Sequence, residues 1–283
     1  MRKLRDRAFT VLAGVAALLA GGCFAAIAGV LLIRGLPAVN WQFLTEQIRL
    51  VGAAGGIFYN LVGTLILITT ALLVSAPLAT GVGLVHAVYL RSAAGRRRLG
   101  VLLYVLNGVP SILFGLFGFI VFVKFFGWGK SWLTGGVLLG VMILPTVAVA
   151  LVERLQSLPQ NYTEAAAGLG LTQSQIIWSV LLPQSASGLV TGSLLGLARA
   201  AGETAPIMFT ATIFAGATVP HGVKESPVLS LPYHIFILAQ DSFDPAVVGK
   251  LWGAAVVLLA LVLGLSLAAL SLRLRIYEEA QHG

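Results

Sequence analysis

An arginine and a glutamate stand four positions apart in RAAGETAP, residues 199–206, within one of the most apolar parts of the chain. The fifteen residues before Arg199 carry no charge, and the next charged residue after Glu203 is Lys224. Residues at i and i+4 share one face of a helix, and a lone arginine in hydrocarbon costs about 2.5–3.5 kcal/mol on insertion scales. The pair is therefore either an ion pair that only makes a helix insertable or a contact that lines a transport pathway.

The composition of the chain indicates membrane-spanning helices, which would place this pair inside a membrane. Hydrophobic residues make up 58% of the 283 residues and charged residues only 10%, whereas a soluble domain carries about 25% charged residues. A membrane-spanning helix needs about 20 apolar residues. Six stretches meet this condition and predict an all-α integral membrane protein with six transmembrane helices, at residues 8–33, 57–90, 99–123, 131–152, 185–214 and 251–272.

The basic residues predict how these helices are oriented. With six spans, eleven of the 18 Lys and Arg residues lie on the side of the two termini, six lie on the other side, and Arg199 lies inside a span. Loops rich in Lys and Arg face the cytoplasm, so we expect both termini to be cytoplasmic. The same bias explains the net charge of +8, and no nucleic-acid partner is expected.

The sequence argues against a cleaved signal peptide and against a metal site. The uncharged stretch 8–33 is too long for the apolar part of a signal peptide. We therefore interpret it as a retained membrane anchor, although it contains the lipoprotein-like sequence LLAGGC that ends at Cys23. None of the four histidines stands in metal-ligand spacing with another, so no metal site is predicted.

One connection on the cytoplasmic side, residues 153–183, is longer than the others, and its sequence predicts two short helices. Asn161 or Thr163 is expected to cap a first helix that has Glu164 in its first turn. Thr172 is expected to cap a second. These residues alone support an interfacial connector helix and a docking helix equally well.

The spacing within this loop resembles the EAA loop of ABC importer permeases, EAA-x3-G-x9-I-x-LP. Every position of the pattern is present, with Val180 in place of Ile. In that family the loop forms a coupling helix that docks in a cleft of a separate ATPase subunit. The chain has no phosphate loop of the form G-x4-G-K-[ST], so we expect a non-catalytic permease subunit without a cofactor, with ATP and Mg²⁺ on the partner. The resemblance implies a coupling role for Glu164, Ala165, Ala166, Gly170 and Pro183.

RAAGETAP itself resembles the R-A-x-G-E-T-A-P signature of phosphate-specific ABC importer permeases of the PstA type. GGIFYNLVGT at 55–64, GVPSILFGLFG at 108–118 and SLPYHIFILA at 230–239 resemble further segments, so the resemblance covers nearly all of residues 55–273. It implies the type I ABC importer permease fold and import of inorganic phosphate into the cytoplasm. Permeases for molybdate, sulfate or phosphonate share the EAA loop but as a rule lack the GETAP ending. They remain the alternative, together with a membrane component that senses phosphate status.

A phosphate anion also suits the residues of the motif. Arginine presents a fixed fork of N–H donors to phosphate oxygens and stays charged at any working pH. Glu203 can hold Arg199 in a closed pathway or accept a hydrogen bond from a protonated phosphate oxygen, and Thr204 adds a hydroxyl donor. We therefore predict a substrate pathway at these three residues. The Gly-rich segment that follows Asn107 is interpreted as a site of helix packing rather than as part of a pore.

The chain is expected to divide into three parts. Residues 1–56 would form an N-terminal transmembrane helix and an external interfacial segment, residues 57–273 the permease domain, and residues 274–283 a cytoplasmic tail. The resemblance implies a heterodimer with a second homologous permease subunit, two ATP-binding subunits, and a periplasmic or extracellular phosphate-binding protein. The expected location is the lipid bilayer of the bacterial cytoplasmic (inner) membrane, which the chain would cross several times.

Overall fold

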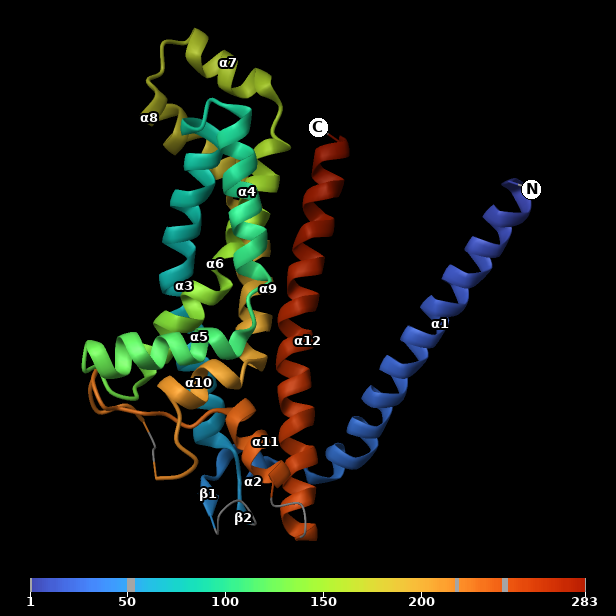
Figure 1. Cartoon of the computed structure of the whole chain (residues 1–283), viewed down its shortest axis with the longest axis vertical. Helices are drawn as coiled ribbons and strands as arrows, with labels where there is room; N and C mark the ends of the chain where they lie inside the picture. Colours follow the sequence, from blue (N-terminus) through green and yellow to red (C-terminus); the bar gives the residue numbers. More distant parts are fainter. Residues whose placement is uncertain (1, 50–53, 217–218, 241–243, 283) are drawn as a thin grey trace.

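The computed structural model describes residues 2–49, 54–216, 219–240 and 244–282. Over the described residues, five helices are long and apolar enough to cross a membrane, and a bent pair makes a sixth crossing if it is one span. The prediction of an all-α membrane protein is thus confirmed. The five helices are α1 (Arg2–Gly35), α3 (Phe58–Leu84), α6 (Trp132–Gln156), α9 (Leu182–Gly202) and α12 (Pro245–His282). Four of them, α3, α6, α9 and α12, run roughly along one axis, and α1 is inclined away from them (Figure 1).

The bent pair replaces the straight helix expected over residues 99–123. α4 (Ala93–Asn107) and α5 (Ser111–Gly118) are separated by a short break, and their axes differ by 87°. Pro110 in this break has no backbone N–H and disfavours helical geometry in the residue before it, which is why α4 stops. α5 and the π-helical turns of Phe119–Phe125 lie across the bundle instead of along it (Figure 1). The stretch predicted as one span is therefore a pair of helices bent at this break.

The helix expected over residues 185–214 is interrupted as well. α9 ends at Gly202, and α10 (Ala205–Thr210) begins after an interruption of two residues. The backbone of Glu203 is extended, with φ −77° and ψ 129°. Pro206, in the first turn of α10, has no N–H that could continue the hydrogen bonds of α9. Glu203 thus lies in a break between two helices rather than inside one.

α6 lies at the centre of the bundle and packs on both α3 and α9. Of the most apolar 18 residues of each helix, 67% are buried in α6 but 0% in α1. Glycines allow the central helices to approach closely, because a Cβ on Gly136 would lie 2.5 Å from Thr70 of α3, and one on Gly192 would lie 2.8 Å from Ala150 of α6. Small residues at such contacts are typical of helices that pack in a membrane.

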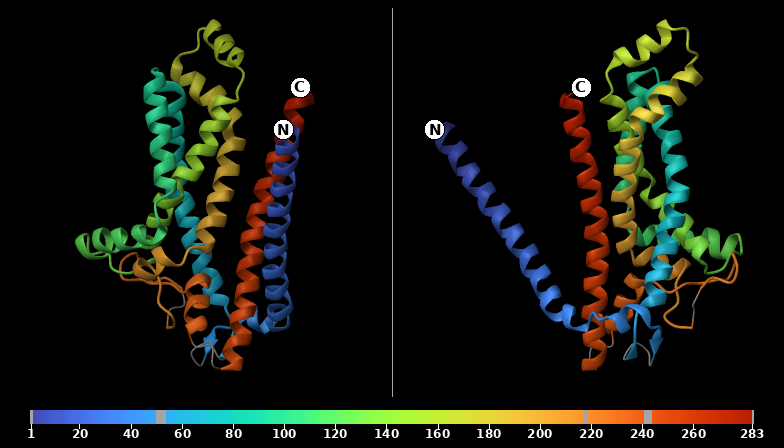
Figure 2. Two further views of the ribbon diagram at one scale, coloured as in Figure 1. Left: turned by 45° about the vertical axis from the view of Figure 1, so that its right-hand side comes forward. Right: turned by 180° about the vertical axis from the view of Figure 1, so that it is seen from behind.

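The two termini lie toward the same end of the molecule. α1 meets α12 near Gly35, where a Cβ would clash with the Trp252 carbonyl oxygen, and then diverges from α12 toward its first residue (Figure 2). Its first residues and the last residues of α12 point toward the end that carries α7 (Gln160–Gly168) and α8 (Gln173–Ile176) (Figure 1). We call this the α7 end. The positive-inside rule predicts that it faces the cytoplasm.

The opposite end consists of short elements. Asn40 caps α2 (Trp41–Thr45), because its Oδ1 accepts a hydrogen bond from the N–H of Phe43 at 2.8 Å. The other elements at this end are the 3-10 turn Leu36–Ala38, the antiparallel strands β1 (Ile48–Arg49) and β2 (Ala54–Gly55), and α11 (Leu231–Gln240).

A buried polar cluster joins α11 to the beginning of α3. The Asn60 side chain donates a hydrogen bond to the Ser230 carbonyl oxygen at 3.4 Å. His234, one turn further along α11, is only 2% exposed, and its ring stacks on Phe214 with 5.8 Å between the centroids. Burial lowers the pKa of His234 from 6.5 to about 4. The imidazole is therefore neutral at neutral pH.

The stability of the protein is expected to fall as the pH is lowered from about 6.5 to about 4, the window set by this shift. In that window the unfolded chain binds a proton at His234 and the folded protein does not, so acid favours unfolding by up to about 3 kcal/mol. Thermal unfolding of the purified protein at a series of pH values measures the loss. His234→Gln should reduce it, whereas His221→Gln, in an exposed loop, should leave it unchanged. Equal acid sensitivity of wild-type and His234→Gln protein would contradict this prediction.

Candidate functional site

The predicted ion pair forms at the end of α9. Arg199 lies in the last turn of the helix and Glu203 directly follows it, and the guanidinium Nε lies 3.8 Å from the carboxylate Oε1. The two side chains are 29% and 17% exposed, so both still reach space that this chain does not fill. The i,i+4 spacing predicted this pair, and it forms although the backbone of Glu203 has already left the helix.

A third polar residue joins this pair from another helix. The Nη1 group of Arg199 donates a hydrogen bond to Oδ1 of Asn107, the last residue of α4. The hydroxyl of Thr146 in α6 donates to the same oxygen at 3.1 Å. Asn107 thus connects α4, α6 and α9 at one point through its side chain, while the glycines of the segment that follows it pack closely as expected. The sequence did contain one sign of this role, because Asn107 is a polar residue directly before the helix-breaking sequence Gly108-Val109-Pro110.

The half-helices that follow the two breaks pack against each other. A Cβ on Gly115 of α5 would come within 2.9 Å of the Ala205 carbonyl oxygen and 3.0 Å of the Pro206 Cα, so this approach requires glycine. Non-helical backbone at membrane depth is tolerated where it is buried in protein or lines a water-filled cavity, and broken helices hold the substrate in many transporters. Thr204 lies half-buried in the second break, next to Glu203. The structure therefore brings the three predicted pathway residues together.

The chemistry of this group suits an oxyanion. Arg199 and Asn107 supply N–H donors, and arginine in particular matches the oxygens of phosphate or carboxylate with two parallel hydrogen bonds. A metal ion would instead need several electron-pair donors around one point. Within the described part of the chain, no three His, Cys, Asp or Glu side chains gather in that way.

The loop at the α7 end contains the two short helices that the sequence predicted. The cap at Thr172 is confirmed, because its hydroxyl accepts the N–H of Gln175 while the Gln175 side chain accepts the N–H of Thr172 at 2.8 Å. Gly170, just after α7, has a φ of +79°, in the left-handed region that favours glycine. Pro183 is the second residue of α9 and directly follows the π-helical turns of Ile177–Leu181, so its missing N–H falls where the helix changes from π to α geometry.

The beginning of α7 differs from the prediction. The helix starts at Gln160, directly after Pro159, and no side chain caps it. Proline pre-sets a backbone dihedral that is compatible with the start of a helix, so the helix begins before either predicted cap, Asn161 or Thr163. Glu164 consequently lies in the second turn, and the expectation that it lies in the first is wrong.

The outer surface of this loop combines charged, small and large apolar side chains. Glu164 and Ala165 are exposed, whereas Ala166 is buried. Leu169 is 81% exposed and Trp178 is 71% exposed. Exposed large apolar side chains that lie close together mark interaction surfaces. Side chains exposed in this way suit contact with a partner and contact with lipid equally, so the docking role of the loop stays a prediction.

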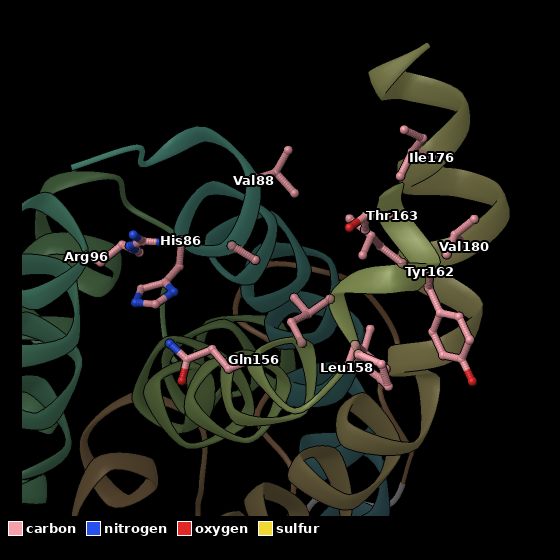
Figure 3. A pocket seen from close by; sticks show the side chains of 13 residues that line it. His86, Val88, Arg96, Gln156, Leu158, Tyr162, Thr163, Ile176 and Val180 are labelled. Carbon is pink, nitrogen blue, oxygen red and sulfur yellow. The ribbon is translucent and has the colours of Figure 1, made fainter. Parts of the chain in front are cut away.

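A cavity of about 410 Å³ lies between α7 and the adjoining ends of α4, α6 and the π-helical turn Val85–Tyr89 that follows α3 (Figure 3). His86, Arg96 and Gln156 lie on one side of it, and Leu158 and Val180 lie on the other (Figure 3). This volume is within the range of small ligand pockets, so α7 is not tightly packed against the bundle. The sequence contains no signal for this cavity.

Comparison with known proteins gives the family of the chain. The family model described as "Binding-protein-dependent transport system inner membrane component" matches residues 79–276. The chain belongs to this family. The matched range contains both helix breaks, the coupling loop and RAAGETAP, and the chain is thus a multi-pass membrane permease.

Individual relatives of the permease are also transport permeases by name. This chain is 33% identical over 224 residues to "Phosphate transport system permease protein PstA 2" of Mycobacterium tuberculosis, and the alignment covers 75% of this chain and 72% of that protein. It is 32% identical over 267 residues to "Probable phosphate transport system permease protein PstA" of Methanocaldococcus jannaschii, covering 94% and 92%. "Probable ABC transporter permease protein YqgI" of Bacillus subtilis is 27% identical over 292 residues and 98% of each chain.

Solved structures agree on the fold of the permease. Inward-facing conformations of the MetNI methionine ABC transporter align with 77% of this chain and 93% of that chain, at a TM-score of 0.55 and 19% identity. The prediction of the type I ABC importer permease fold is therefore confirmed.

In the permease, Gly170→Ala is expected to loosen α7, whereas Gly168→Ala is not. A Cβ at either position meets no atom within 4 Å, so neither change causes a clash. Only Gly170 has a positive φ, and an L residue in that conformation costs about 1–2 kcal/mol. Hydrogen exchange of the α7 amides should therefore be about 5–30 times faster in Gly170→Ala. Equal exchange rates in the two variants would show that the left-handed turn does not hold the loop.

Proposed function

We propose that this permease is the transmembrane subunit of an ATP-driven ABC importer that translocates inorganic phosphate into the cytoplasm. The observation that carries the proposal is the guanidinium of Arg199, held between Asn107 and Glu203 where two broken helices meet. A fork of N–H donors at such a place suits an oxyanion. Relatives that are named phosphate transport permeases favour phosphate among the oxyanions.

The pathway residues have different roles in this proposal. Arg199 binds the anion through its N–H groups, and Thr204 adds a hydroxyl donor. Glu203 holds the guanidinium in the absence of the anion and accepts a hydrogen bond from the protonated oxygen of hydrogen phosphate. Sulfate carries no proton at neutral pH, so the same carboxylate would repel it. Glu203 would thus favour phosphate by rejecting its competitor.

A second homologous permease subunit would complete the pathway as a heterodimer. α1 diverges from its own bundle (Figure 2), and 0% of its most apolar window is buried in this chain. Arg199 and Glu203 are also only partly covered. A second bundle beside this one would cover apolar surface and enclose the anion between the two chains.

Two ATP-binding subunits would dock on the coupling loops of the two permeases. ATP and Mg²⁺ would bind to those subunits, and this chain would carry out no covalent chemistry. A periplasmic or extracellular phosphate-binding protein would deliver the anion at the end that carries α2 and α11, in the bacterial cytoplasmic (inner) membrane. The residues proposed to couple this chain to the ATPase are Glu164, Ala165, Ala166, Gly170 and Pro183; Glu164 and Ala165 are exposed for contact, whereas Ala166 packs inside the loop.

Uptake of labelled phosphate by the complex reconstituted in vesicles tests this function. Unlabelled phosphate should compete, and molybdate, sulfate and phosphonate in tenfold excess should not. Glu203→Gln should narrow the preference for phosphate over sulfate, and an unchanged preference would remove Glu203 from the selective step. ATP-driven uptake of molybdate or sulfate in preference to phosphate would assign the permease to another oxyanion.

A further inference from the structure

The amide group of Asn107 has an orientation that the chemistry of its neighbours determines. Its Oδ1 accepts hydrogen bonds from Arg199 and from Thr146. Arginine has N–H donors and no acceptor, so the amide nitrogen cannot face Arg199. The NH₂ group must therefore point away from these two residues. The Asn107 side chain is exposed, and no hydrogen bond within the described parts of the chain uses its Nδ2.

Arg199 also keeps donors that no residue in the described ranges uses. A guanidinium carries five N–H groups. One faces Glu203 through Nε, and one binds Asn107 through Nη1, which leaves three. These three groups and the two on Asn107 Nδ2 are donors that come from α9 and from α4, on either side of the shared hydrogen bond.

We propose that Asn107 is a direct ligand of the transported oxyanion. Nδ2 donates a hydrogen bond to one oxygen of the anion, while Oδ1 keeps Arg199 directed at another oxygen of the same anion. The inference rests on the proposed function, because it adds a residue to the same pathway. A neutral donor strengthens the site without a second positive charge, and a transport site must release its substrate as well as bind it.

The position of Asn107 also makes binding sensitive to helix movement. It is the last residue of α4, directly before the break that turns the chain by 87°. Arg199 lies in the last turn of α9, directly before the other break. The anion therefore bridges two helix ends, and a displacement of α9 relative to α4 separates the donor groups and releases the anion.

Two substitutions distinguish a ligand from a residue that only positions Arg199. Asn107→Asp retains an oxygen that accepts from Arg199 and Thr146, and its charge strengthens that contact. It replaces both N–H donors by a negatively charged oxygen. Asn107→Ala removes the oxygen and the donors together. If Asn107 only positions Arg199, Asp is the milder change, and if it binds the anion, Asp is the more severe one.

The experiment is a phosphate concentration series with the reconstituted complex of permeases, ATPase and binding protein. We expect Asn107→Ala to raise the KM of uptake about tenfold and Asn107→Asp to raise it at least about 30-fold, the loss typical of a hydrogen bond to a charged group. Assembly and basal ATP hydrolysis should stay at wild-type levels. Uptake by Asn107→Asp that equals or exceeds that of Asn107→Ala would overturn the inference.

A second pair of variants keeps the inference testable if the Asn107 variants do not assemble. Thr146→Val removes one of the two donors that orient the amide and should raise KM about threefold at unchanged maximal rate. Thr80→Val in α3 is the matched control, because its hydroxyl donates to the Ala76 carbonyl oxygen of its own helix and bonds to neither Asn107 nor Arg199. A KM of Thr146→Val equal to that of the control would contradict the oriented amide.

The same measurements separate this inference from the proposed function. If the wild-type complex prefers another oxyanion, the assignment to phosphate fails, and the order of the Asp and Ala variants is measured with that anion. If phosphate is transported and Asn107→Asp behaves like wild type, the proposed function stands and the role of Asn107 as a ligand is refuted.

Discussion

Replacing Arg199 by alanine is expected to lower phosphate uptake by about 100-fold or more. The change removes every donor of the guanidinium and leaves the Glu203 carboxylate without its 3.8 Å partner, so the anion would face an uncompensated negative charge. Removing one partner of an enclosed charge pair costs about 2–5 kcal/mol, a range that applies here once the proposed second bundle covers the pair, and each 1.4 kcal/mol is a factor of ten in rate or affinity. Initial rates of labelled phosphate uptake in reconstituted vesicles measure the effect.

Two further variants show whether the loss in Arg199→Ala comes from the substrate pathway or from coupling to the ATPase. Arg199→Lys keeps the charge but loses the planar fork, so it should retain uptake between that of wild type and that of Arg199→Ala. Glu164→Ala, on the exposed side of α7, should instead reduce ATP hydrolysis stimulated by the binding protein, or the assembly of the complex. Arg199→Ala should preserve at least part of that stimulation. Normal transport by Arg199→Ala would remove the central residue of the proposed pathway.

The largest loss of stability is expected from Gly63→Ala in α3. A Cβ at this position would lie 1.9 Å from the Leu229 carbonyl oxygen, a backbone atom that cannot move alone. The same backbone is tied to α3 by the N–H of Leu231, which donates to the Thr64 hydroxyl at 2.9 Å. The substitution would therefore push the chain between α10 and α11 away from α3, at a cost of about 3 kcal/mol. Thermal unfolding of the purified permease measures the loss.

The same helix offers a matched control. Gly81 also lies inside α3, but a Cβ there meets no atom within 4 Å. Gly81→Ala should leave stability unchanged or raise it by up to about 1 kcal/mol, because alanine favours the helix more than glycine does. Equal melting temperatures of the two variants would show that the contact between Gly63 and Leu229 does not hold the outer loop.

Local signals in the sequence were sufficient for some parts of the structure. The spans follow from the apolar stretches, because backbone groups in lipid must be satisfied within a helix. The cap at Thr172 and the turn at Gly170 depend on residues a few positions away, so the sequence predicts both. The pair of Arg199 and Glu203 was equally visible, since a charge inside an apolar stretch requires a partner.

Other parts depend on contacts that the sequence does not display. Pro110 indicates a break in a helix, but the 87° turn also requires α5 to pack on α10 through Gly115. The bond between Asn107 and Arg199 joins residues 92 positions apart, and no local pattern relates them. The start of α7 was misplaced, because the helix begins directly after Pro159 without any side-chain cap, whereas the prediction relied on the capping residues further along the chain. The cavity beside α7 reflects absent packing, for which a sequence has no signal.

The continuous helical segment Gln173–Gly202 has a mechanical consequence for transport. It contains 30 residues and is about 45 Å long at 1.5 Å per residue, with the coupling loop at one end and Arg199 near the other. If the segment pivots near α8, a tilt of about 5° moves its far end by about 4 Å, which exceeds the length of a hydrogen bond. The angular change required from the ATPase is therefore small, and amplification by the length of one helix is enough to break the contact between Arg199 and Asn107.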